Sequence, residues 1–176
     1  MLTTRRLKNK TVSLQARLSS LDDDAAEQLP TVDERQKAFR RAAMNSLARR
    51  EHSRYELMQK LQQQGAEPAE AQAVVARLMA ENLQSDLRFA EAMVRYQRNR
   101  SKGPLWIRQW LQEKGIDAGL IAEQLSGSDW LAEAQAVRER RFGPELPRTA
   151  QERAKQMRFL AQRGFSADQM RALFRD

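Results

Sequence analysis

The stretch that decides the fold is residues 85–116, which read SDLRFAEAMVRYQRNRSKGPLWIRQWLQEKGI. Ser85 suits a helix N-cap, because its side-chain oxygen can accept from the free N–H groups of the first turn. Pro104 suits the first position of a second helix, where its missing N–H leaves no hydrogen bond unmade. Gly103 is expected to permit the turn before it, and Gly115 to end the second helix in a left-handed conformation. The stretch therefore predicts two helices joined by a short turn.

Each predicted helix carries apolar residues at helical spacing on one face and basic residues elsewhere. The apolar stripe of the first helix is Leu87, Ala90, Met93 and Val94, and that of the second is Ile107, Trp110 and Leu111. The basic side chains of the stretch form a candidate contact face: Arg88, Arg95, Arg98, Arg100, Lys102 and Arg108.

This basic face has an ordinary and a functional interpretation. In the ordinary one it is solvated helix surface, with Glu91 pairing with Arg88 and Arg95 one turn away on either side. Between Glu91 and Glu113, however, the sequence has no acidic residue. The basic groups between them repel one another unless an anion lies near, so we expect them to face either DNA phosphates or an acidic protein surface.

A threefold repeat sets the architecture. The segments KLQQQGAEPAEAQAVVARL from Lys60, WLQEKGIDAGLIAEQL from Trp110 and FLAQRGFSADQMRALF from Phe159 resemble one another. Their glycines, Gly65, Gly115 and Gly164, recur about every 50 residues. Each repeat reads as three helices, and neither alternating nor continuous β-branched runs indicate a strand.

The expected fold is all-α, with three tandem three-helix repeats stacked into an elongated, curved molecule. The repeats are predicted at residues 33–84, 85–127 and 128–176, after an N-terminal arm at 1–32 that is flexible or loosely docked. The expected helix caps are Asp33, Ser53 with Glu56, Asp117, Ser128, Thr149 with Glu152, and Ser166. A further apolar stripe, expected inside the first repeat, is Ala71, Val74, Val75, Leu78 and Met79.

Composition narrows the function. The 31 Lys and Arg residues outnumber the 23 Asp and Glu residues, so the net charge of +8 favours polyanionic partners, nucleic acid first. The absence of cysteine excludes disulfides and thiol catalysis. With one histidine and no glycine-rich phosphate loop, we expect no metal site, no cofactor and no enzymatic activity. The acidic run Asp22, Asp23 and Asp24 reads as a solubilising segment.

The sequence predicts neither a secretory signal nor a membrane span. The first residues carry charge without an apolar run, unlike a secretory signal. No window approaches the ~20 apolar residues of a membrane span. We therefore expect a cytoplasmic protein that does not bind membranes.

Several other residues have a structural interpretation beside a functional one. Arg49, Arg50, Arg140 and Arg141 end equivalent helices of the first and third repeats, where cations also favour the helix dipole. Their recurrence would also line basic groups along one side. Trp106 and Trp110 are expected mainly in the core, with Trp106 the better candidate for an exposed contact. His52 is expected to be structural or exposed.

The middle repeat resembles the RecX regulatory protein family. The residues that carry this resemblance are Asp86, Arg88, Phe89, Ala90, Gly103, Ile107, Leu111, Gly115 and Ile116. In the first repeat, Arg50, Ser53, Glu56, Leu57 and Leu61 match the opening segment of the same family. The resemblance covers roughly Asp33 to the end of the chain.

The resemblance implies three tandem three-helix repeats and a non-enzymatic, cytoplasmic modulator of the RecA recombinase in DNA repair, recombination and the SOS response. Such proteins lie in the groove of the RecA–DNA filament, usually inhibit its ATPase and strand-exchange activities, and block its extension. We therefore expect a monomer whose partners are the RecA filament and, weakly and without sequence preference, DNA. An inhibitor and a stabiliser of the filament could share this basic surface.

Two alternatives stay open on the sequence. The first is an autonomous DNA-binding protein that uses the turn at residues 102–104 as a helix-turn-helix. Its weakness is that Trp106, Ile107 and Trp110 make the second helix apolar, where a recognition helix needs polar side chains that read bases. The second alternative is a scaffold for another acidic partner.

Overall fold

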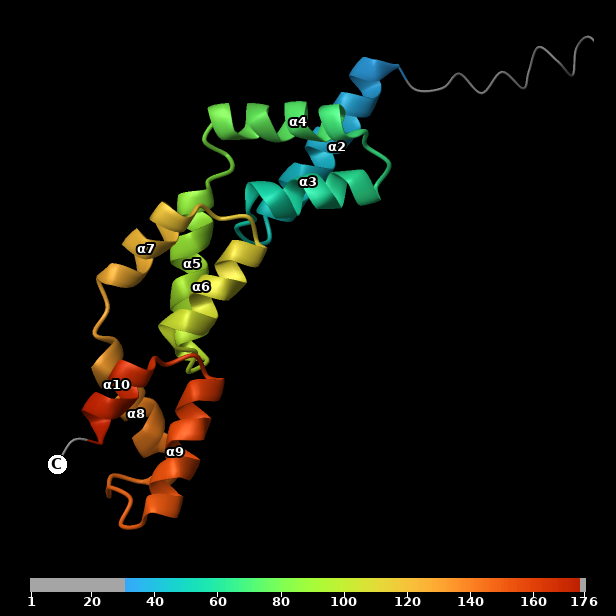
Figure 1. Ribbon diagram of the computed structural model, residues 1–176. Helices are drawn as coiled ribbons and strands as arrows, with labels where there is room; N and C mark the ends of the chain where they lie inside the picture. The colour runs from blue at the N-terminus through green and yellow to red at the C-terminus, as the bar shows by residue number, and fades with distance from the viewer. Residues whose placement is uncertain (1–30, 175–176) are drawn as a thin grey trace, which may run out of the picture. The chain divides into compact units, whose positions relative to one another are not determined.

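The computed structural model describes residues 31–174 of the chain, and these residues are helical with no strand among them (Figure 1). The helices are α2 (Val32–Leu47), α3 (Arg54–Gln63), α4 (Pro68–Ala80), α5 (Asp86–Asn99), α6 (Pro104–Glu113), α7 (Ala118–Ser126), α8 (Trp130–Phe142), α9 (Ala150–Gln162) and α10 (Ala167–Leu173). The all-α prediction is confirmed. The predicted N-terminal arm and its acidic run lie outside the described residues, and the elongated, curved shape stays a prediction.

The helices form three successive triplets. In the first, α3 packs on α4, and apolar residues of α2 join the core between them. In the second, α5, α6 and α7 pack on one another, and in the third α8, α9 and α10 do the same. The chain divides after Arg35 into two units, and residues 36–176, which hold the packed cores of all three triplets, form the second unit.

The sequence explains most of the helix starts. The Ser85 hydroxyl accepts from the Arg88 N–H (3.3 Å), and Asp117 accepts from the N–H groups of Gly119 and Leu120. Two helices of the third triplet begin with the predicted polar caps. Thr149 forms a capping box with Glu152, and Ser166 forms one with Gln169.

Three predicted caps are wrong in part. At α2 the cap is Thr31, which accepts from the Glu34 N–H, so Asp33 lies inside the first turn. At α8 the cap is Asp129, one residue beyond Ser128. Ser53 does cap α3, accepting from the Glu56 N–H (3.1 Å). The Glu56 carboxylate, predicted to complete the box, instead binds cations of other segments.

The turn between α5 and α6 differs from the expected one. Its left-handed residue is Ser101, with φ 60°, whereas Gly103 has φ −85°. Gly103 is required for another reason, because a Cβ atom there would lie 2.5 Å from the Gly164 carbonyl oxygen. Gly115 has the positive φ that was predicted for it, 73°, and the equivalent glycines Gly65 and Gly164 share it, with φ values of 90° and 88°.

The apolar residues form two cores. One lies within the first triplet and contains Leu57, Leu61, Val75 and Leu78. The other runs without interruption through the second and third triplets, from Phe89 to Phe174. The second and third repeats are therefore joined through apolar packing, whereas the first repeat has a core of its own.

Two residues placed in apolar stripes prove to be exposed. Leu87 of α5 is 43% exposed and Met79 of α4 is 40% exposed. In α5 the buried face contains Phe89, Ala90 and Val94 instead. Spacing alone could not separate these neighbours, because residues at the edge of a helical stripe satisfy the same period.

Candidate functional site

The joint between the first and second repeats is polar and holds Arg88, the first residue of the predicted basic face. The Arg88 Nε lies 2.9 Å from a Glu51 carboxylate oxygen, and its two terminal nitrogens donate to the side chain and backbone carbonyl of Asn82. Glu91, the expected partner of Arg88, forms no ion pair within residues 31–174. The Arg88 guanidinium is therefore bound within the joint between the two repeats.

Asp86 completes the same joint. Its carboxylate accepts from the backbone N–H of Arg54 (2.8 Å) and from the Gln84 side-chain amide (2.9 Å). The Gln84 amide also donates to the His52 carbonyl (3.1 Å). The start of α5 is thus fastened to the start of α3, which accounts for an aspartate at this position.

Glu56 is the ionic centre of this region. Its carboxylate lies 3.0 Å from Arg50, 3.3 Å from the His52 Nδ1 and 3.2 Å from the Lys114 Nζ of the second repeat. Burial acts to raise the pKa of Glu56, but hydrogen bonds from Arg50 and Lys114 outweigh it, and the pKa is lowered. Burial, followed by the Arg50 charge, lowers the pKa of His52. Arg50 is therefore engaged in structure.

A glycine contact recurs at the two joints. Gly115 lies against Tyr55 near the start of α3, and Gly164 lies against Trp106 near the start of α6. The residue before each glycine also reaches back to the preceding repeat: Lys114 to Glu56, and Arg163 to the Arg100 carbonyl (3.1 Å). Each joint thus uses the same turn of the repeat.

Arg98 belongs to the joint between the second and third repeats. Its guanidinium pairs with Glu133 of α8, donates to the Ser128 hydroxyl (3.1 Å) and lies 5.5 Å from the centre of the Trp130 ring. Trp130 is 8% exposed, and its indole N–H donates to the Leu125 carbonyl (2.8 Å). Arg98 is half-buried and fixed in direction by these contacts.

Beside Arg98 lies a polar hollow between α5 and α8, with a volume of about 530 Å³. The residues that line it, called here the arginine hollow, are Arg95, Arg98, Asn99, Glu133 and Arg140. Arg140 donates to the Ser101 hydroxyl (3.1 Å), and Arg95 is exposed. Three guanidinium groups face one carboxylate, so the lining carries a formal charge of +2.

The remaining predicted cations lie on helices α6 and α8 and in the turns after α2 and α5. Arg100 contacts the Tyr96 hydroxyl (3.0 Å), Lys102 lies 4.2 Å from the centre of the Trp106 ring, and Arg141 lies over the Phe142 ring. Arg49 and Arg108 are exposed. Within the part of the chain that the structure describes, none of these five forms an ion pair with a carboxylate. The predicted face is thus divided between joint residues and uncompensated surface cations.

The tryptophans of the second repeat are packing residues. Trp110 stacks on Phe89 and Trp106 on Trp110, with ring centres 6.1 and 6.4 Å apart. Trp106, the predicted exposed contact, is only half-exposed and packs against the backbone of Gly164.

The family motif also serves the fold. Phe89, Ala90, Ile107, Leu111 and Ile116 are buried together in the larger core. The other residues that carry the resemblance in the middle repeat lie at the joints: Asp86, Arg88, Gly103 and Gly115.

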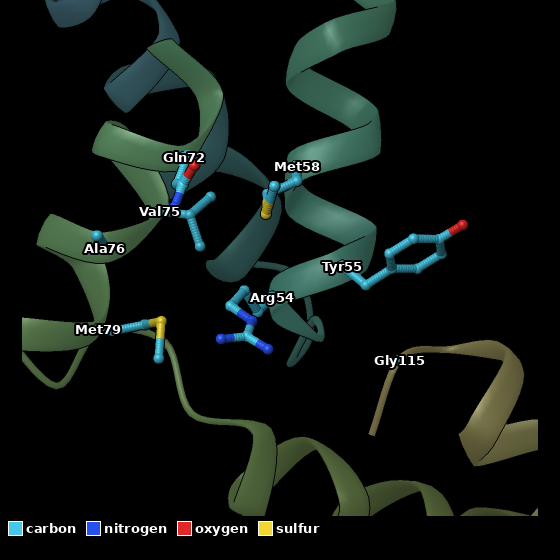
Figure 2. Close-up of a pocket in the computed structure, with 8 residues that line it drawn as sticks. All are labelled: Arg54, Tyr55, Met58, Gln72, Val75, Ala76, Met79 and Gly115. Carbon is cyan, nitrogen blue, oxygen red and sulfur yellow. The ribbon is translucent and has the colours of Figure 1, made fainter. Parts of the chain in front are cut away.

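A second hollow, of about 570 Å³, lies between α3 and α4 of the first repeat and is bordered by Gly115 of the second, and nothing in the sequence indicated it. Figure 2 shows Met58 of α3 and Val75 and Met79 of α4 lining the space between these helices, with Arg54 at one end. Met79 resembled a core residue in the sequence. Its partial exposure was the property that spacing could not reveal.

Within residues 31–174, no helix is both long and apolar enough to cross a membrane. Across the same residues, no three His, Cys, Asp or Glu side chains are grouped as a metal site would require.

Comparison with known proteins identifies the repeats. Residues 40–78, 85–125 and 128–174 match the models of the first, second and third three-helix domains of RecX, respectively. The chain is 47% identical over 137 residues to the regulatory protein RecX of Halorhodospira halophila, covering 77% of this chain and 85% of that protein. It is 44% identical over 133 residues to the RecX of Pseudomonas entomophila, covering 74% and 86% of the two chains.

Solved structures agree on the fold. The crystal structure of RecX from Lactobacillus salivarius superposes with a TM-score of 0.69 at 24% identity, over 80% of this chain and 95% of that one. A second RecX crystal structure gives the same TM-score at 21% identity, over 81% and 72% of the two chains. With three matched domains and relatives above 40% identity over most of its length, this chain belongs to the RecX family of regulatory proteins.

Proposed function

We propose that this chain is a non-enzymatic regulator of the RecA recombinase that binds along the groove of the RecA–DNA filament. The observation that carries the proposal is its membership of the RecX family through all three domains. Its net charge of +8 supports a polyanionic partner such as a nucleoprotein filament. The proposed direction is inhibition of ATP hydrolysis, strand exchange and filament extension. The proposed setting is cytoplasmic DNA repair and recombination, including the SOS response, with the protein acting as a monomer.

The proposed contact residues are the surface cations that the fold leaves uncompensated. Arg95 and Arg140 of the arginine hollow are the first candidates, because both are exposed and neither forms an ion pair within residues 31–174. Arg100, Lys102 and Arg108 are further candidates on the second repeat. Arg88 and Arg98 are proposed to act indirectly, by fixing the repeats that present the other cations.

The mechanism we infer is bridging of neighbouring filament subunits. A chain of repeats that touches more than one subunit fixes their spacing. We infer that the ATPase cycle of the filament depends on that spacing, so a protein bound more tightly to one arrangement shifts the population toward it. Because one molecule would restrain several subunits, inhibition is expected below one regulator per RecA.

The test is RecA-catalysed ATP hydrolysis on single-stranded DNA with increasing amounts of this protein. We expect the steady-state rate to fall at substoichiometric ratios, and to recover as salt weakens the ionic contacts. An unchanged rate at every ratio would refute regulation of RecA. A sequence-selective mobility shift on duplex DNA without RecA would instead support autonomous DNA binding.

A further inference from the structure

The arginine hollow has the composition of an anion site. Its five lining residues are all polar or charged, with three arginines against one glutamate. We propose that this hollow binds the phosphodiester backbone of a nucleic-acid strand, without reading its bases, and that Glu133 is a built-in competitor that weakens the binding. The proposal deepens the proposed function and rests on it for its biological setting.

The three guanidinium groups have different degrees of freedom. Arg98 is held by Glu133, Ser128 and the face of Trp130. Arg140 is steered by one hydrogen bond to Ser101, and Arg95 has no ion-pair partner within the described part of the chain. A fixed inner cation flanked by two adjustable outer ones can meet a flexible strand, because the planar guanidinium fork matches phosphate oxygens.

Phosphate fits this hollow better than an acidic protein surface does. Stable protein contacts are centred on apolar or aromatic anchors in a desolvated pocket, and the lining of this hollow offers none. A strand, in contrast, carries a regular series of charges and releases counterions at each phosphate that is neutralised.

Glu133 is expected to weaken strand binding, although it is part of the hollow. The carboxylate lowers the formal charge of the lining from +3 to +2 while it orients Arg98. Glutamine has nearly the same shape and keeps an oxygen that can accept from Arg98, but it has no charge. The substitution E133Q should therefore strengthen binding to a strand, whereas a purely structural role for Glu133 predicts no gain.

The experiment measures binding of a fluorescein-labelled oligothymidylate to the full chain, without RecA, by anisotropy at several salt concentrations. We expect R95Q and R140Q each to reduce the slope of log K against log salt by ~0.7, which corresponds to about fivefold weaker binding at 0.1 M salt. We expect E133Q to strengthen binding. The matched control is R158Q, which removes the same charge from an exposed position of α9 outside the hollow.

The outcomes separate the two proposals. Any of three results would overturn the phosphate site. R95Q and R140Q could bind the strand as R158Q does, or E133Q could bind it more weakly while its helical circular dichroism stays intact. The third result is that the unsubstituted protein does not bind the strand at low salt. Such a result with inhibition of RecA intact leaves the proposed function standing. If R95Q and R140Q reduce the salt slope as expected but the unsubstituted protein does not change RecA ATP hydrolysis, the phosphate site is supported and the proposed function is overturned.

Discussion

At the scale of single residues, Glu56 shows how the polar joint is stabilised. Its side chain is 14% exposed and is shared by Arg50 and by Lys114 of the next repeat. Glutamine at this position would keep the shape but lose both ionic contacts. We expect E56Q to lower the free energy of unfolding at pH 7 by about 1.5–3 kcal/mol, the usual worth of a hydrogen bond to a charged group. Urea unfolding followed by circular dichroism measures it.

The sign of the pH dependence of Glu56 follows from its lowered pKa. The carboxylate stabilises the folded state fully above its unfolded pKa of ~4.3, and that stabilisation is lost as the pH falls through the lower folded pKa. The stability difference between the unsubstituted protein and E56Q should therefore shrink as the pH drops below 4. A difference that stays constant from pH 7 to pH 3 would contradict the ionic role of Glu56.

His52 makes a separate contribution at higher pH. It is 7% exposed, and burial lowers its pKa below the ordinary value. Below pH ~6.5 the unfolded chain binds a proton that the folded chain accepts less readily, so stability should fall as the pH drops from 7.5 to 5.5. We expect H52Q to flatten this dependence in urea unfolding measurements. An unaltered slope would mean that other groups titrate there.

At the scale of elements, the approach of α6 to the turn after α9 depends on Gly103. A Cβ atom there would meet the Gly164 carbonyl oxygen at 2.5 Å, and the Gly103 N–H donates to the Arg163 carbonyl (2.7 Å). We expect G103A to lower the free energy of unfolding by about 1–3 kcal/mol, because the backbones must separate. G127A is the control, since a Cβ at Gly127 meets open space. Equal stability of the two variants would contradict this contact.

Much of the element scale could be predicted from the sequence, because helix period, polar caps and repeated glycines act locally. Ser85, Asp117 and Thr149 cap their helices as expected. The role of Gly103 could not be predicted, since it depends on Gly164, a residue of another repeat.

The candidate site was predictable only in part. Charge and spacing marked Arg95, but they could not show that Arg88 and Arg98 are taken up by carboxylates of other repeats. They also gave no reason to group Arg95 with Arg140, because only the packing of α5 near α8 brings these side chains to one hollow.

At the scale of the whole molecule, the two cores predict uneven stability. The first repeat has its own core and meets the second through polar contacts and the Gly115–Tyr55 contact, whereas the second and third share one core. All three tryptophans, Trp106, Trp110 and Trp130, lie in the shared part. We expect urea to change the circular dichroism before the tryptophan fluorescence, because the first repeat unfolds first. Coincident transitions would indicate one cooperative unit.

Contact between the arginine hollow and the RecA filament is tested most directly by the rate of RecA ATP hydrolysis on single-stranded DNA with three forms of this protein. We expect the unsubstituted protein and R158E to inhibit at substoichiometric ratios, and the double variant R95E/R140E to require much higher concentrations. Full inhibition by the folded R95E/R140E protein would contradict the claim that the arginine hollow contacts the filament.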